Sequence, residues 1–85
     1  MQQFEHTVKT PGGIHARTTG LLVNIANAHQ SRVLILRGSA KADLKRPIEL
    51  LSLSVRQNET ITVQVEGPDE EACCAALAAY MKDSV

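Results

Sequence analysis

Aromatic residues are almost missing from this chain of 85 residues, since Phe4 and Tyr80 are the only two and tryptophan is absent. Proteins that bind single-stranded nucleic acid stack the bases on aromatic side chains, so little is available here for that role. An excess of basic charge is missing as well, because nine basic and nine acidic residues cancel. We therefore expect no nucleic-acid partner.

Cysteine is scarce too, and the only two, Cys73 and Cys74, are adjacent. Neighbouring cysteines rarely form a disulfide with each other, and two ligands do not make a structural zinc site. On a helix, Cys74 would line up with Leu77 and Met81, and Cys73 would share a face with Leu77 and Tyr80. We expect buried thiols here, with no disulfide, no metal site and no cofactor.

Long apolar runs are also missing. No stretch approaches the roughly 18 apolar residues that a membrane-spanning helix needs, and the N-terminus lacks the basic-then-apolar layout of a signal peptide. We expect a single cytoplasmic domain over residues 1–85 that does not insert into a membrane.

The hydrophobic pattern that is present predicts seven elements in the order βαββαβα. They are a strand of about seven residues ending at Val8, a helix over about 16–28, strands over 32–37 and 40–43, a helix beginning at 45–47, a strand over 60–66, and a helix over about 70–82 that the run Gly67-Pro68-Asp69 caps. The first helix should bury a stripe of four apolar residues, Leu21, Leu22, Ile25 and Ala26. Four strands with three helices on one face make an open-faced two-layer α/β (α+β) sandwich.

Two of the three histidines have structural explanations. His6 shares the apolar side of its strand with Phe4 and Val8, which predicts a half-buried residue. His29 follows the first predicted helix, where a cation is mildly favourable. We assign neither a catalytic role.

The third histidine, His15, ends a turn-forming run that starts at Pro11 and contains Gly12 and Gly13. A helix that begins just after His15 would point its free N–H groups and positive dipole end at this residue, which is a site for an anion such as phosphate. Arg17 adds a cation that matches phosphate oxygens, and a neutral imidazole is a nucleophile. Chemistry alone also allows a plain loop histidine beside a surface arginine.

The run Gly13-Ile14-His15-Ala16-Arg17 resembles the active-site motif of the HPr family, the histidine-containing phosphocarriers of the bacterial sugar phosphotransferase system. The resemblance covers nearly the whole chain, including its length, the position of His15, the segment 44–53 and the acidic run 67–71. It implies the HPr fold, with a four-stranded antiparallel sheet. It also implies a carrier rather than an enzyme, which takes a phosphoryl group from enzyme I on Nδ1 of His15 and passes it to the A component of a sugar permease.

The resemblance also implies which residues surround this chemistry. Arg17 would stabilise the phosphoryl group, and Ala16 and Thr18 would complete its cradle. Carried over by position, the partner-docking residues are Gly20, Asn24, Asn27, Lys45, Arg46, Pro47, Ile48, Leu51 and Ser52. An apolar centre with a basic rim would suit transient, acidic partners of a monomeric carrier. Ile48 and Leu51 are equally compatible with a place in the core.

Two positions depart from the family pattern. Thr18 stands where the family usually has proline, and its extra N–H and hydroxyl lead us to expect a longer-lived phosphorylated form or a looser turn. Arg46 stands where many Gram-positive relatives carry a regulatory serine, so that regulation should be absent at this site. Neighbouring Ser52 and Ser54 do not occupy the matching position.

Two alternative functions stay open from the sequence. One is a diverged HPr paralogue with a nitrogen-related or regulatory docking role. The other is a small ligand-binding regulatory domain of the βαββαβ type, which would need a ligand crevice and usually a dimer.

Overall fold

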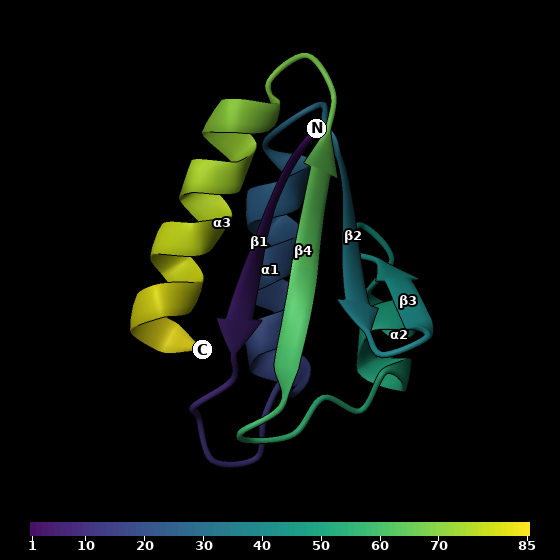
Figure 1. Ribbon diagram of the computed structural model, residues 1–85, viewed down its shortest axis with the longest axis vertical. Coiled ribbons are helices and arrows are strands. Elements are labelled where there is room, and N and C mark those ends of the chain that lie inside the picture. The colour runs from purple at the N-terminus through teal and green to yellow at the C-terminus, as the bar shows by residue number, and fades with distance from the viewer.

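The computed structural model describes residues 1–85 and contains the seven predicted elements in the predicted order (Figure 1). They are β1 (Gln2–Thr7), α1 (Ala16–Asn27), β2 (Arg32–Arg37), β3 (Ala40–Asp43), α2 (Pro47–Ser52), β4 (Thr60–Glu66) and α3 (Glu70–Ser84). The predicted limits are wrong by a residue or two at three places. β1 ends before Val8, α1 ends before Ala28, and α3 continues two residues past Lys82.

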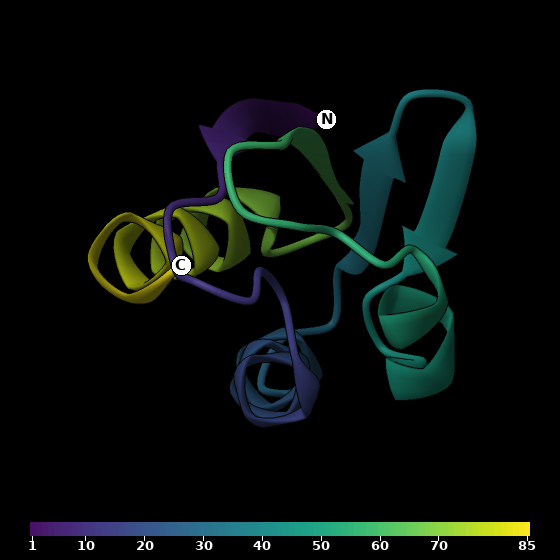
Figure 2. The same ribbon diagram turned by 90° about the horizontal axis from the view of Figure 1, so that it is seen from below.

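The four strands form one antiparallel sheet in the order β1-β4-β2-β3. The central strand β4 pairs with both β1 and β2, so that Val63 lies opposite Phe4 on one side and Ile35 on the other. All three helices cover the same face of this sheet, as the end-on view shows (Figure 2). The open-faced two-layer sandwich expected from the sequence is therefore confirmed.

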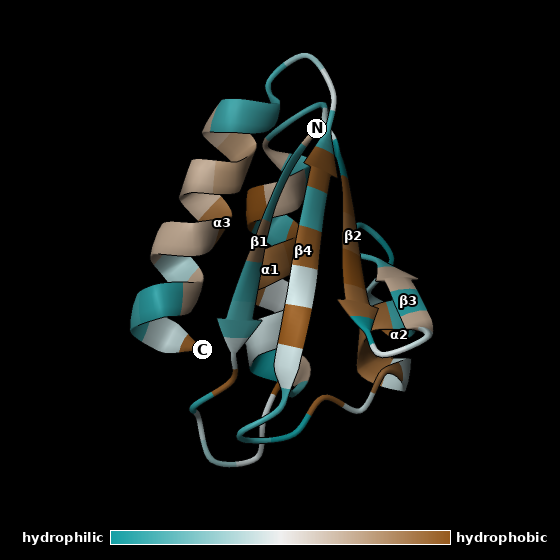
Figure 3. Cartoon of the chain, in the orientation of Figure 1, coloured by the Kyte–Doolittle hydropathy of each residue, from teal (hydrophilic) through white to brown (hydrophobic).

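The core lies between the sheet and the helices because the strands alternate in polarity. In β4, Ile61, Val63 and Val65 are fully buried, whereas Thr62 and Gln64 between them lie half-exposed on the opposite face (Figure 3). His6 is half-buried, as its place in the strand pattern predicts. No helix is long and apolar enough to cross a membrane.

Two predicted helix faces are partly wrong. In α1, Leu22, Val23 and Ala26 are buried, while Leu21 is 42 % exposed. The buried stripe is therefore shifted round the helix from the predicted one, with Val23 in the core in place of Leu21.

In α3, the residues that line up in the core are Cys73, Leu77 and Met81, each fully buried, rather than Cys74 with Leu77 and Met81. Cys74 is half-buried at the edge of the core, and both cysteines are free thiols. Burial raises the pKa of both thiols, Cys73 and Cys74, above the ordinary value.

Candidate functional site

The turn before α1 depends on one glycine that no other residue can replace without strain. Gly13 has φ +68°, and an added Cβ would lie 2.1 Å from the carbonyl oxygen of Val55. This close approach lets the Ile14 N–H donate to the same carbonyl at 3.0 Å. The turn is therefore pinned to the segment after α2, and His15 follows it at a defined position.

His15 is the N-cap residue of α1, with an extended backbone (φ −116°, ψ −177°) and no capping bond from its side chain. Its carbonyl accepts the Thr19 N–H at 2.8 Å, the first hydrogen bond that joins the cap to the helix. The backbone bonds include none from the N–H groups of Ala16, Arg17 or Thr18. Since the first turn also holds no acidic residue, the positive end of α1 is open to an outside anion.

The imidazole of His15 is exposed and has one hydrogen-bonding partner in the chain. Its Nε2 lies 3.4 Å from the hydroxyl oxygen of Thr18, a residue that is itself only 6 % exposed. The chain's hydrogen bonds leave Nδ1 without a partner. Arg17 is also exposed and takes part in none of the three ion pairs, so its guanidinium is free to meet an anion.

A hollow of about 290 Å³ surrounds these groups. Its wall adds four residues that the sequence did not suggest, namely Thr10, Leu21, Tyr80 and Ser84. The end of α3 reaches this place because the carbonyl of Val85 accepts the N–H groups of Lys9 and Thr10, at 2.7 and 3.2 Å (Figure 1). No local pattern could have revealed the contribution of Tyr80, since it lies 65 positions away from His15 in the chain.

The predicted docking residues lie at the surface along α1 and α2. Ile48 is 79 % exposed and Leu51 is 41 % exposed, so both are surface residues, while Leu50 and Leu53 of the same segment enter the core. Leu21, at 42 % exposure, adds a third apolar side chain. Gly20, Asn24, Asn27, Arg46, Pro47 and Ser52 are also exposed.

The basic residues of this surface differ in how free they are. The ammonium of Lys45 donates to the carbonyl of His29 at 2.9 Å and so caps the end of α1. Arg46 lies 3.6 Å from Glu49, and both side chains are largely exposed, which makes this a weak pair. Arg17 is therefore the free cation beside His15, and Arg46 is a weakly paired cation at the start of α2.

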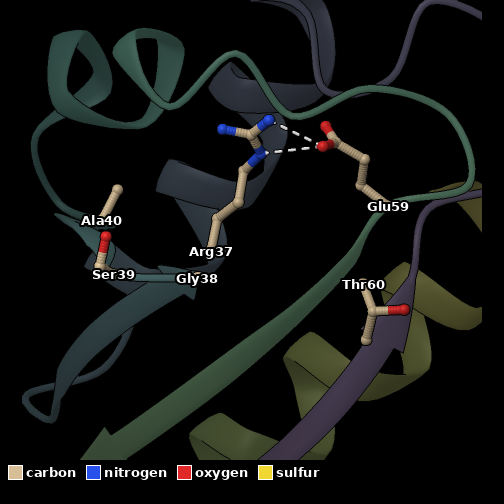
Figure 4. Close-up of a pocket in the computed structure, with 6 residues that line it drawn as sticks. All are labelled: Arg37, Gly38, Ser39, Ala40, Glu59 and Thr60. Carbon is tan, nitrogen blue, oxygen red and sulfur yellow. Dashed lines mark hydrogen bonds and ion pairs between the residues drawn. The ribbon is translucent and has the colours of Figure 1, made fainter.

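Another hollow, of about 490 Å³, lies between the β2–β3 turn and the start of β4 (Figure 4). It holds an ion pair in which the Arg37 guanidinium donates twice to one oxygen of Glu59, at 3.1 and 2.7 Å. The other oxygen of Glu59 accepts the Arg56 N–H at 2.7 Å. Hydrogen bonds hold the pKa of Glu59 below its ordinary value; the largest contribution comes from Arg37 and the next from the Arg56 N–H. Because these charges are paired, we interpret the hollow as a structural clamp.

The remaining titratable residues do not gather into a metal site, because no group of three or more potential ligands occurs. His29 lies at the end of α1, and its Nδ1 is 2.9 Å from the carbonyl of Ile25. This is the structural place that the sequence predicted for it.

The fold is that of small phosphocarrier proteins. The family model described as "PTS HPr component phosphorylation site" matches residues 2–83. The chain therefore belongs to the HPr family of the phosphotransferase system.

Individual relatives support the same assignment. The phosphocarrier protein HPr of Mycoplasma genitalium is 35 % identical over 83 residues, which cover 96 % of this chain and 94 % of that protein. The HPr-like protein Crh of Bacillus subtilis is 33 % identical over 84 residues, with 99 % and 96 % coverage. Among solved structures, an HPr from Thermoanaerobacter tengcongensis superposes with a TM-score of 0.93 at 28 % identity, over 98 % of this chain and 93 % of that one.

Proposed function

We propose that this chain is a phosphocarrier in which Nδ1 of His15 accepts a phosphoryl group from enzyme I and passes it to the A component of a sugar permease. The observation that carries the proposal is the open end of α1. A histidine with a partnerless Nδ1 caps a helix whose first three N–H groups have no acceptor in the chain. A phosphoryl group on that nitrogen would lie close to the free N–H donors and the positive dipole end of α1.

The surroundings suit transfer better than storage. Phosphoryl transfer depends on positioning and on neutralising charge, and the backbone N–H groups with Arg17 supply both. His15 lies at the surface beside a hollow of about 290 Å³, so the reacting atoms of a partner can approach it directly. A stoichiometric carrier without a cofactor has no need of an enclosed pocket.

The proposed docking surface consists of Gly20, Asn24, Asn27, Lys45, Arg46, Pro47, Ile48, Leu51 and Ser52. Leu21 extends it, because this exposed side chain also lines the hollow around His15. An apolar centre with arginines beside it fits brief contacts with acidic partners. We expect the carrier to be a cytoplasmic monomer, because the same surface must meet two partners in turn.

The diverged-paralogue alternative uses the same fold with a regulatory docking role. The observation in its favour is the similarity to Crh of Bacillus subtilis, which is comparable to the similarity to HPr relatives. The ligand-binding domain is not supported, because the chain belongs to the HPr family.

The test is intact-protein mass spectrometry after incubation with enzyme I and phosphoenolpyruvate. The native chain should gain one acid-labile phosphoryl group, and His15→Ala should gain none. His29→Gln is the matched control and should be phosphorylated like the native chain, because His29 is engaged at the end of α1. Failure of the native chain with several enzyme I proteins would overturn the carrier proposal and favour the docking role.

A further inference from the structure

The hydroxyl group of Thr18 is the one side-chain partner of the His15 imidazole. It lies 3.4 Å from Nε2, and Thr18 is nearly buried while the ring is exposed. The two residues meet because a cap residue and the third residue of a helix lie on the same side of the first turn. The nearly buried Thr18 therefore offers its hydroxyl to the exposed ring of His15 from a defined position on the helix.

A neutral imidazole carries a single proton, on Nδ1 or on Nε2, and the other nitrogen keeps the lone pair. The hydrogen bond made by one nitrogen decides which form is present. Thr10, Tyr80 and Ser84 also line the hollow, and their hydroxyl groups can donate as well as accept. The free N–H groups of residues 16–18 and the unpaired guanidinium of Arg17 can only donate. A proton on Nδ1 would add one more donor to this group, whereas a lone pair there complements them.

We propose that Thr18 is a positioning residue whose hydroxyl oxygen accepts the Nε2–H of His15 and so holds the lone pair on Nδ1. Threonine can do this through its oxygen, and the proline usual at this position in the family cannot. The device therefore belongs to this chain and to relatives with a hydroxyl at the same place.

The consequence for phosphotransfer rests on the proposed function. The Nδ1 lone pair forms the new bond to phosphorus, while the bond from phosphorus to the donor breaks and its electron pair stays on the donor. The proton remains on Nε2, so the phosphorylated ring is an imidazolium hydrogen-bonded to Thr18. When the phosphoryl group leaves, Nδ1 recovers the electron pair and the ring returns to the starting tautomer. No proton has to move in either direction.

The first test measures the tautomer directly, by ¹⁵N NMR of the unphosphorylated ring at a pH of about 9, where an ordinary histidine is neutral. The Nε2–H form should dominate in the native chain. Thr18→Val, which replaces the hydroxyl by a methyl group, should lower the ratio of Nε2–H to Nδ1–H by about fivefold, the effect of one ordinary hydrogen bond. Thr18→Ser should keep the native ratio.

Thr19→Val is the matched control, because Thr19 is also buried and its hydroxyl has no hydrogen-bonding partner, His15 included. It should leave the tautomer ratio unchanged. Thr18→Ala serves as a second variant without the hydroxyl, in case the valine displaces the ring. An unchanged ratio in both hydroxyl-free variants, or a dominant Nδ1–H form in the native chain, would overturn the inference.

The second test is the rate of phosphoryl transfer from enzyme I, which should fall several-fold in Thr18→Val and recover in Thr18→Ser. The two tests separate the two proposals, since the NMR measurement needs neither enzyme I nor phosphate. A tautomer shift in a chain that is never phosphorylated would support the role of Thr18 and overturn the carrier function. Normal phosphorylation with no tautomer shift would do the reverse.

Discussion

The N-terminal ends of α1 and α3 differ in how their free N–H groups and positive dipoles are met. At α3, the chain supplies its own anions, since Asp69 is the cap residue and Glu70 and Glu71 follow in the first turn. At α1, the cap is His15 and no acidic residue follows. Both ends need negative charge for the same electrostatic reason, but only α1 leaves the place open.

Two of the three carboxylates at α3, those of Asp69 and Glu70, are engaged with other parts of the molecule. Glu70 accepts the Gly67 N–H at 3.3 Å and pairs with the N-terminal ammonium of Met1 at 2.8 Å. Both contacts hold the pKa of Glu70 below its ordinary value, and the hydrogen bond to the ammonium is the larger cause. Asp69 accepts the N–H groups of Gln30 and Ser31 at 3.0 Å and the Ser31 hydroxyl. The α3 end is therefore a structural junction.

This difference in carboxylates between the two helix ends shows where an exchangeable anion can bind in this fold. A helix end that already holds its own carboxylates gains little from a phosphoryl group and would repel it. A helix end without them supplies donors to whatever anion arrives. Substitutions at either end test whether the missing anion at α1 controls phosphoryl transfer.

The largest effect is expected from Gly13→Ala, which should disrupt the turn that leads to α1. The new Cβ would meet a backbone carbonyl at 2.1 Å while φ stays positive, so we expect a loss of at least about 3 kcal/mol in the free energy of unfolding. Chemical denaturation measures it. Gly12→Ala is the control, because it has φ +83° with open space around it and should lose only about 1 kcal/mol. Equal losses in the two variants would contradict the close approach at Gly13.

The next largest effect is expected from Ala16→Asp, which gives α1 the anion that it lacks. The folded chain should be slightly more stable, by about 0.5 kcal/mol, because a carboxylate suits a helix N-terminus. The rate of phosphorylation by enzyme I should fall about tenfold, a barrier increase of about 1.4 kcal/mol. The reason is that the new carboxylate would occupy the free N–H groups of α1 and repel the incoming phosphoryl group.

The matched control is Ala72→Asp, which places the same charge in the exposed first turn of α3. It should leave the phosphorylation rate unchanged. Equal slowing by both variants would mean that net charge, and not the open end of α1, controls the reaction.

A smaller effect is expected from Thr18→Pro, which removes one free N–H and the hydroxyl from the α1 end. With one donor fewer, the phosphorylated form should decay about twofold to fivefold faster, the effect of about one hydrogen bond. Time courses of phosphohistidine quenched in alkali, where the N–P bond survives, would measure the lifetime. An unchanged lifetime would show that the extra donor does not act on the phosphoryl group.

The smallest effect is expected from Asp69→Asn at the α3 junction. Hydrogen bonds hold the pKa of Asp69 below its usual value; the largest contribution comes from the Ser31 hydroxyl and the next from the Gln30 N–H. The carboxylate therefore stabilises the fold above the unfolded-state pKa of about 3.9, and this contribution is lost as the pH falls through the lower folded pKa.

Asp69→Asn should consequently lower Tm by a few degrees near pH 7, and the difference should vanish at low pH. Thermal unfolding followed by circular dichroism between pH 2 and 7 would show this. Glu71→Gln is the control, because Glu71 is exposed and takes part in no recorded ion pair. A constant difference at every pH would contradict a role for the charge of Asp69.

Most of the fold could be predicted because local patterns carry it. Alternation at Ile61, Val63 and Val65 predicts β4 with one buried face, and the structure confirms it. The α3 cap shows the limit of such patterns. Asp69 holds the predicted cap position, but its carboxylate bonds to Gln30 and Ser31 instead of to the helix, because the loop just before β2 brings those groups within reach.

The docking surface shows a second limit. Ile48 and Leu51 are as apolar as Leu50 and Leu53, and only packing against the sheet and α1 decides that the second pair is buried. A helix of six residues is too short for its hydrophobic period to choose a face alone.

Local sequence is sufficient to predict the order of the elements, the glycine turn and the placing of His15 and Arg17 at the start of a helix, because these depend on neighbours within a few positions. The contribution of Tyr80 and Ser84 to the hollow beside His15 depends on the tertiary structure, as do the bonds from Asp69 to Gln30 and Ser31 and from Glu70 to Met1. The tertiary structure also decided which apolar side chains of α1 and α2 stay exposed. These properties arise from contacts between segments far apart in the chain, and no local pattern of residues encodes such distances.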